Sequence, residues 1–155
     1  MEKEEVMRRA IALATENVAN GGGPFAAVIV QDGTVVAEGV NRVTADNDPT
    51  AHAEVSAIRA ACARLETFDL SGCEIYTSCE PCPMCLGAIY WAHLDRIFYG
   101  NTKDDAAGIG FDDAFIYREL ALEPRYRSKP SEMLLRDEAM HTFRQWQLNP
   151  DKVGY

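Results

Sequence analysis

Residues 73–92 read CEIYTSCEPCPMCLGAIYWA, and the prediction of the fold depends on this stretch. Its first part, Cys73–Ser78, is typical of a β-strand. Its second part, Pro83–Ala92, predicts a helix, because a proline in the first turn of a helix sacrifices no hydrogen bond. Three of the five cysteines of the chain lie within the seven residues from Cys79 to Cys85. A strand followed by a cysteine cluster at the start of a helix indicates a functional site at which the cysteine sulfurs bind a metal or undergo redox chemistry.

The segments on either side of this stretch supply the remaining elements. Residues 3–19 have apolar residues near the 3.6-residue period and predict a helix, which the run Gly21–Pro24 ends. Asp32-Gly33 predicts a tight hairpin turn. The other predicted elements are strands at 25–30, 34–39 and 96–99, helices at 51–64, 112–122 and 137–148, and a loop at 41–50. Residues 123–136 are compatible with a strand or a loop. This order predicts one domain, residues 1–155, with a mixed sheet between helices.

Composition and charge exclude several classes of function. The chain has 155 residues and a formal net charge of -9, which argues against a polynucleotide as the main partner. It has no apolar run of about 18 residues, so we expect no membrane partner. The acidic start of the sequence does not resemble a signal peptide. An odd number of cysteines fits a reducing compartment, and we therefore expect a cytoplasmic protein.

Two motifs together predict a metal site. Cys82 and Cys85 are spaced one helical turn apart, so both sulfurs can reach one ion, and His52 could add an imidazole nitrogen. Two thiolates and one imidazole suit Zn²⁺ and leave the fourth tetrahedral position open. Both motifs lie at predicted helix N-termini, where the helix dipole favours the thiolate form of cysteine. Glu54, two residues beyond His52, could carry protons at such a site without binding the metal.

Two alternatives to this interpretation remain open at this stage. The Cys-x-x-Cys pair could be a redox pair, although Pro81 and Pro83 flank Cys82. The zinc could instead be structural, with Cys79 as the fourth ligand, although Pro81 separates Cys79 from the helical turn of the other two. The combination His-x-Glu with Pro-Cys-x-x-Cys is the signature of zinc-dependent nucleobase deaminases, and it is more specific than either half.

The chain resembles the cytidine deaminase-like superfamily, and within it the short, zinc-dependent bacterial guanine deaminases. The resemblance is carried by the segments Gly22–Phe25, Asn47–Glu54, Thr77–Ala92 and Gly110–Tyr117. It implies a three-layer α/β/α sandwich around a central mixed five-stranded sheet. It also implies hydrolytic deamination of guanine to xanthine and ammonia, with one Zn²⁺ per subunit held by His52, Cys82 and Cys85.

The resemblance also implies roles for individual residues. Glu54 and Asp113 would be catalytic, with Asp113 relaying a proton to the leaving amine while Asp112 caps its helix. The implied substrate-binding residues are Phe25, Asn41, Ala53, Trp91, Asp113 and Tyr155. Other interpretations exist for four of them. Phe25 and Trp91 could be core residues, and Asn41 could cap a turn. Asp113 could be the helix cap, with Asp112 in the functional role.

The resemblance further implies a homodimer in which a C-terminal segment, about residues 137–155, is swapped between subunits. Tyr155 would then cover the active site of the partner subunit, and the substrate would be a small purine base rather than a nucleic acid. Three alternatives compete with this function. They are a tRNA adenosine deaminase, a cytidine or cytosine deaminase, and a zinc-stabilised interaction module without activity.

Overall fold

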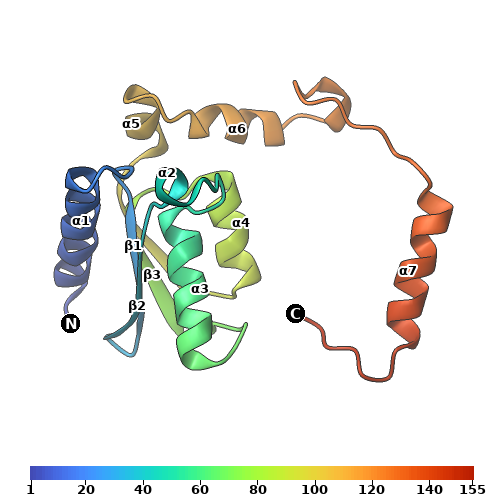
Figure 1. The fold of residues 1–155 in the computed structure, drawn as a ribbon, viewed down its shortest axis with the longest axis horizontal. Coiled ribbons are helices and arrows are strands. Elements are labelled where there is room, and N and C mark those ends of the chain that lie inside the picture. The colour runs from blue at the N-terminus through green and yellow to red at the C-terminus, as the bar shows by residue number, and fades with distance from the viewer. The chain divides into compact units, whose positions relative to one another are not determined.

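A mixed sheet of four strands organises the first part of the molecule. We describe the protein from a computed structural model of residues 1–155. The strands are β1 (Ala26–Gln31), β2 (Thr34–Val40), β3 (Cys73–Cys79) and β4 (Arg96–Asn101), in the order β2-β1-β3-β4 (Figure 1). β1 pairs antiparallel with β2 and β3, whereas β3 pairs parallel with β4. The predicted hairpin is present, and both Asp32 and Gly33 have the positive φ that such turns require.

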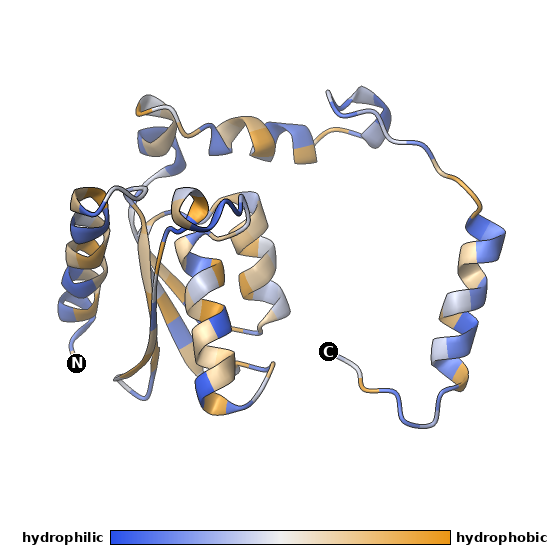
Figure 2. Cartoon of the chain, viewed as in Figure 1, coloured by the Kyte–Doolittle hydropathy of each residue, from blue (hydrophilic) through white to orange (hydrophobic).

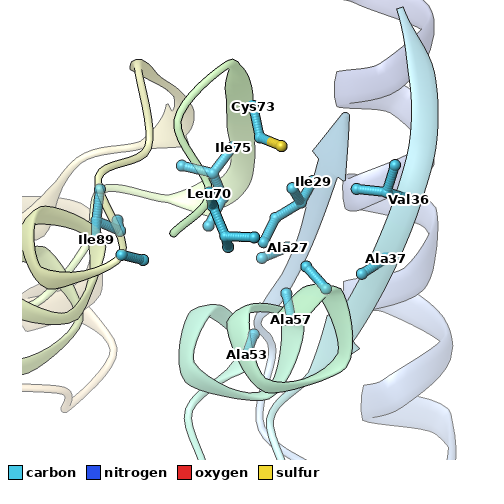
Figure 3. Close-up of a cluster of buried hydrophobic side chains, with 12 residues drawn as sticks. Ala27, Ile29, Val36, Ala37, Ala53, Ala57, Leu70, Cys73, Ile75 and Ile89 are labelled. Atoms are coloured by element: carbon cyan, nitrogen blue, oxygen red, sulfur yellow. The ribbon is translucent and has the colours of Figure 1, made fainter. Parts of the chain in front are cut away.

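Helices pack against both faces of this sheet. Along β1, Ala27 and Ile29 face a core that includes α3 (Ala53–Leu65) and α4 (Pro83–Trp91), and Figure 3 shows their side chains there. The intervening Val28 and Val30 pack against α1 (Lys3–Ala19). This two-residue alternation is what a strand buried on both sides requires. In Figure 2 the strands are largely in the hydrophobic colours, which fits their position between helices.

Small residues bring α3 close to the sheet. Ala53, Ala57 and Ala61 recur every four residues on one side of α3, and all three are fully buried. Gly39 of β2 lies directly beneath this side, where a Cβ atom would collide with the backbone of Ala53 and Ala57. This close approach holds the N-terminus of α3, and therefore the His-x-Glu motif, firmly at one edge of the sheet.

The prediction of five strands was wrong, because the sheet has four. The segment between residues 123 and 136, predicted as a strand or a loop, contains only the 3₁₀ turn Pro124–Tyr126 and irregular backbone. Pro124 and Pro130 lack the N–H group that a strand donates to its neighbour, which disfavours pairing in this segment. The mixed character of the sheet was predicted correctly.

Three short helices lie outside the sheet and the helices that cover it. The predicted loop at 41–50 contains a one-turn helix, α2 (Val43–Asp46), and the predicted helix at 112–122 is α6 (Asp113–Leu120). A further helix that was not predicted is α5 (Lys103–Gly108), whose N-terminus is closed by a capping box between Thr102 and Asp105. No helix in the structure has both the length and the apolar character that crossing a membrane requires.

The chain divides into two compact units, Met1–Tyr117 and Arg118–Tyr155. The second unit contains the predicted C-terminal helix, α7 (Arg136–Leu148), and none of its residues is buried. Within it, Arg127 donates a hydrogen bond to the carbonyl oxygen of Glu119 at 3.1 Å. Its exposed large apolar residues are Leu120, Leu122, Tyr126, Met133, Leu134, Leu135, Phe143, Trp146, Leu148, Val153 and Tyr155.

Candidate functional site

The structure brings the three predicted metal ligands together. His52 is the N-cap residue of α3, Cys82 is the N-cap residue of α4, and Cys85 lies in the first turn of α4. The Nδ1 atom of His52 lies 3.4 Å from the Sγ atom of Cys82 and 3.4 Å from that of Cys85. The three ligand atoms lie within 4.8 Å of one another, and no other group of His, Cys, Asp or Glu residues gathers in this way.

This geometry fits a tetrahedral zinc ion. Zn–S and Zn–N bonds of about 2.3 Å and about 2.0 Å at a tetrahedral angle place sulfur and nitrogen about 3.5 Å apart. The observed separations of 3.4 Å agree with that spacing. Both helices present their N-termini to the group, so their dipoles favour anionic sulfur there. With three protein ligands, a bound Zn²⁺ keeps one open position, which is typical of catalytic rather than structural sites.

Cys79 does not join this group. Its side chain is buried, and its Sγ atom instead faces the carbonyl oxygen of Thr102 at 3.6 Å. Burial raises the pKa of the Cys79 thiol to about 12, so it stays protonated near neutral pH. A fourth cysteine ligand, which a structural zinc site would need, is therefore not supplied by Cys79.

The two ligand cysteines differ in their affinity for protons. A hydrogen bond from the Cys85 thiol lowers the pKa of Cys82, and the His52 imidazole lowers it further. The same hydrogen bond raises the pKa of Cys85, because the proton is held between the two sulfurs. The hydrogen bond to Cys82 also raises the pKa of His52. The thiolate that metal binding requires is thus favoured at Cys82.

Glu54 is a buried carboxyl group beside the metal ligands. It lies in the first turn of α3, only 6% exposed. Burial raises its pKa to about 7, because water no longer solvates the carboxylate, while a hydrogen bond with Cys85 acts in the opposite direction. A carboxyl group with a pKa near neutrality can both accept and release a proton, which is what general acid–base catalysis requires.

A cavity of about 360 Å³ opens onto this group. Among the residues predicted from the sequence, it is lined by Phe25, Asn41, His52, Glu54, Cys82 and Asp113. Its size suits a small ligand. Most of the predicted site residues, which come from five separate segments of the chain, therefore share one cavity.

Asn41 is held in one orientation at the rim of this cavity. Its Oδ1 atom accepts a hydrogen bond from the backbone N–H of Val43 at 3.2 Å. Asn17 fixes the backbone around it by donating to the carbonyl oxygens of Gly23 and Asn41, at 2.8 Å and 3.0 Å. Asn41 therefore caps a turn through its Oδ1 atom, as the alternative interpretation predicted. Because Oδ1 accepts this hydrogen bond, the N–H groups of the amide remain available as donors to a ligand.

Two neighbouring acids at the start of α6 have different roles. Asp112 Oδ1 accepts a hydrogen bond from the backbone N–H of Phe115 at 3.2 Å, which confirms the prediction that Asp112 caps the helix. Asp113 lines the cavity, where burial raises its pKa. Next to it, the rings of Phe25 and Phe111 meet edge to face with centroids 4.9 Å apart and form an aromatic wall.

Two of the predicted substrate-binding residues of the first unit, Ala53 and Trp91, do not line the cavity. Ala53 is fully buried in the core beneath α3. Trp91 is 66% exposed and lies with Leu86 and Tyr90 on a separate, shallow pocket along α4. Tyr155 belongs to the second unit and is 80% exposed.

Several residues that line the cavity were not predicted as substrate-binding or catalytic residues. They are Gly23, Val43, Thr44, Pro49, Cys79, Glu80 and Phe111. Glu80 had a detectable signal, since it lies inside the cysteine motif, and Phe111 directly precedes the Asp-Asp pair. Val43, Thr44 and Pro49 come from the segment predicted as a loop, where no side-chain pattern indicates which residues face a ligand.

Comparison with known proteins places this site in a family. Residues 1–101 match the family described as the cytidine and deoxycytidylate deaminase zinc-binding region. The chain is 51% identical over 156 residues to the guanine deaminase of Bacillus subtilis, and the match covers all of both proteins. The X-ray structure of guanine deaminase from Bacillus subtilis has a TM-score of 0.96, covering 100% of this chain and 99% of that one.

Two further relatives are more distant. A guanine deaminase structure from Nitrosomonas europaea has a TM-score of 0.70 at 32% identity, covering 93% of this chain and 84% of that one. A tRNA-specific adenosine deaminase of Aquifex aeolicus is 36% identical over 109 residues, which is 70% of this chain and 72% of the relative. The fold, the metal group and these matches agree, and the chain belongs to the family of zinc-binding cytidine and deoxycytidylate deaminases.

Proposed function

We propose that this protein is a zinc-dependent guanine deaminase that hydrolyses guanine to xanthine and ammonia. The observation that carries the proposal is the extent of the likeness to a guanine deaminase. That likeness covers the whole chain, including residues 102–155 beyond the zinc-binding region, at 51% identity. The match to a tRNA-specific adenosine deaminase, in contrast, covers 70% of the chain.

The residues around the cavity support hydrolytic deamination. When bound by His52, Cys82 and Cys85, Zn²⁺ supplies Lewis acidity and lowers the pKa of a water molecule so that it can act as a nucleophile. Glu54 accepts a proton from this water on its carboxylate and delivers it to the ring nitrogen next to C2 of guanine. Its pKa of about 7 suits both steps.

Asp113 is positioned for the second half of the reaction. It lines the same cavity as Glu54, and burial raises its pKa, so its carboxyl group can hold a proton. Together with Glu54 it would pass a proton to the exocyclic amine, which then leaves as ammonia. In its ionised form, the same carboxylate accepts hydrogen bonds from N–H groups on the edge of guanine.

The cavity also suits recognition of guanine. Phe25 and Phe111 offer apolar surface to a flat ring. Asn41 lines the cavity, and its N–H donors remain available to a ligand because its oxygen accepts a hydrogen bond from Val43. Guanine presents the acceptors O6, N7 and N3, whereas adenine has a donor amine in place of O6. A buried donor that meets another donor remains unpaired, so this arrangement favours guanine over adenine.

Alternative functions have less support. A tRNA adenosine deaminase needs a surface that attracts a polyanion, and the formal net charge here is -9. A cytidine or cytosine deaminase would share the chemistry with a smaller ring. An inactive interaction module is disfavoured by the buried Glu54 beside the metal group, because a buried ionisable carboxyl group is costly to maintain without a function.

We further propose that the active form is a cytoplasmic homodimer in which the C-terminal segment, about residues 137–155, crosses to the partner. A segment with many exposed apolar residues and no buried residue needs another surface to cover it. In the dimer, Tyr155 would close the cavity of the other subunit and exclude bulk water. The five free cysteines fit a reducing compartment.

The proposed reaction is tested by product analysis. The purified zinc-loaded chain is incubated with guanine, and xanthine is followed by chromatography while ammonia is measured in the same samples. We expect equal amounts of both products, and none from a Glu54→Gln variant that retains zinc. Xanthine without ammonia, or neither product from a folded and zinc-loaded protein, would contradict the proposal.

A further inference from the structure

The helix that carries Asp113 is not anchored by a hydrophobic core. α6 begins at Asp113, and none of its residues is buried. Helices on a protein surface are normally fixed by an apolar face buried beneath them, which α6 lacks. Specific contacts must therefore determine where the Asp113 carboxylate lies relative to the metal group.

The strongest such contact comes from Tyr117. Its hydroxyl group donates a hydrogen bond of 2.6 Å to the carbonyl oxygen of Pro81. This is a short, well-formed hydrogen bond between segments 36 residues apart in the sequence. Burial raises the pKa of Tyr117 to about 12, so the hydroxyl keeps the proton that it donates.

Lys103, one member of a charged pair, contacts the ring of Tyr117. The Nζ atom of Lys103 lies 5.3 Å from the ring centroid, within the range of a cation–π contact. The same Nζ atom lies 3.6 Å from the carboxylate of Glu80, and Glu80 also accepts the backbone N–H of Lys103 at 3.0 Å. Pro81, which accepts the hydrogen bond from Tyr117, and Glu80, which pairs with Lys103, both belong to the segment that leads into Cys82.

The position of Tyr117 in the helix connects this contact to the cavity. Asp113 and Tyr117 are four residues apart and lie on the same side of α6. Pro81 directly precedes Cys82, a residue of the metal group. A single hydrogen bond therefore joins the side of the helix that carries Asp113 to the peptide next to Cys82.

We propose that Tyr117 is a positioning residue, whose hydrogen bond to Pro81 holds α6 so that Asp113 stays at a fixed place opposite the metal ligands. The kinetic part of this inference rests on the proposed guanine deaminase activity. The structural part does not, because it concerns the order of α6 whether or not guanine is the substrate.

The structural part is tested by hydrogen–deuterium exchange of the full-length protein. Tyr117→Phe removes only the hydroxyl group, and we expect faster exchange of the amides of residues 114–120, with no change in β1 or β3. The matched control is Tyr99→Phe, since Tyr99 is an exposed tyrosine on β4 within the same unit. Exchange in α6 that is the same for Tyr117→Phe as for Tyr99→Phe would overturn the proposal.

The kinetic part is tested by a double-mutant cycle. We expect Tyr117→Phe to lower kcat for guanine by about 5-fold to 10-fold, the effect of one hydrogen bond, with little change in KM and full zinc content. If Tyr117 acts through Asp113, adding Tyr117→Phe to Asp113→Asn should cause no further loss. Losses that simply multiply would overturn the positioning role. Absence of guanine turnover by the unmodified protein would instead refute the proposed function. The exchange experiment would still test whether the hydrogen bond between Tyr117 and Pro81 orders α6.

Discussion

The Sγ atom of Cys82 lies 3.4 Å from the Nδ1 atom of His52, although the two residues are 30 positions apart in the sequence. Each is the N-cap residue of a helix, α4 for Cys82 and α3 for His52, and these helices pack on the same face of the sheet (Figure 1). The fold therefore builds the site by aligning two helix N-termini. Glu54 follows in the first turn of α3, where it is buried against the same group.

The first prediction concerns the metal. Cys82→Ala should lose most of the zinc, because it leaves only two ligands for the ion. Cys62→Ala is the matched control, since Cys62 lies on α3 away from the ligand group and should retain about one zinc per chain. Elemental analysis of the purified variants measures both. Full zinc content in Cys82→Ala would refute the assignment of the ligands.

The second prediction separates proton transfer from metal binding. Glu54→Gln keeps the shape of the side chain but cannot carry a proton, so turnover should fall by roughly 10²-fold to 10⁴-fold while zinc content is unchanged. Glu66→Gln, at the exposed C-terminal end of the same helix, should behave like the unmodified protein. If Glu54→Gln instead loses zinc, Glu54 is a metal ligand and the proton-carrier role is wrong.

Much of this site could be predicted from the sequence, because local patterns identify it. The spacing of Cys82 and Cys85 and the His-x-Glu motif indicate one ion whatever the fold around them, and the structure brings these residues together. The role of Asp112 as a cap was also predicted, since capping depends on neighbouring backbone groups.

Features that depend on distant contacts were not predictable. The resemblance implied a pocket-wall position for Trp91, with a core position as the alternative, but Trp91 is exposed on a separate surface of α4. The contact of Tyr117 with Pro81 spans 36 residues and has no local signal. The count of five strands came from the resemblance, whereas Pro124 and Pro130 disfavour a further strand between residues 123 and 136.

The third prediction concerns the orientation of Asn41. A Cβ atom on Gly23 would lie 3.1 Å from Cγ and Oδ1 of Asn41, so Gly23→Ala should push the amide out of place. We expect kcat/KM for guanine to fall by about 10-fold or more, because small displacements of a substrate-positioning group are costly. Zinc content should stay the same.

Gly108→Ala is the control for this substitution. Gly108 is the last residue of α5, and an added Cβ atom would meet nothing within 4 Å. Steady-state kinetics of both variants should show a loss only for Gly23→Ala. Equal activity of the two variants would mean that the position of Asn41 is unimportant for the reaction.

The fourth prediction concerns the C-terminal segment. Deleting residues 150–155 should sharply reduce guanine turnover while the protein stays folded with zinc bound, because Tyr155 would no longer cover the partner's cavity. Refolding this truncated chain together with the full-length Glu54→Gln chain forms a dimer that combines an intact Glu54 with an intact tail. Activity should then partly return. No recovery in demonstrated heterodimers, or full activity of the truncated chain alone, would refute the crossing of the tail.

The central claim is that the cavity beside His52, Cys82 and Cys85 deaminates guanine, and it is tested most directly by ammonia release from several substrates under identical conditions. The substrates are guanine, adenine, cytosine, cytidine and a tRNA anticodon stem-loop, and the Glu54→Gln variant serves as the blank. We expect kcat/KM for guanine to exceed every other value by at least about 100-fold, since buried hydrogen-bonding groups discriminate strongly against mismatched partners. Faster release of ammonia from the stem-loop adenosine, or from cytidine, would contradict the account.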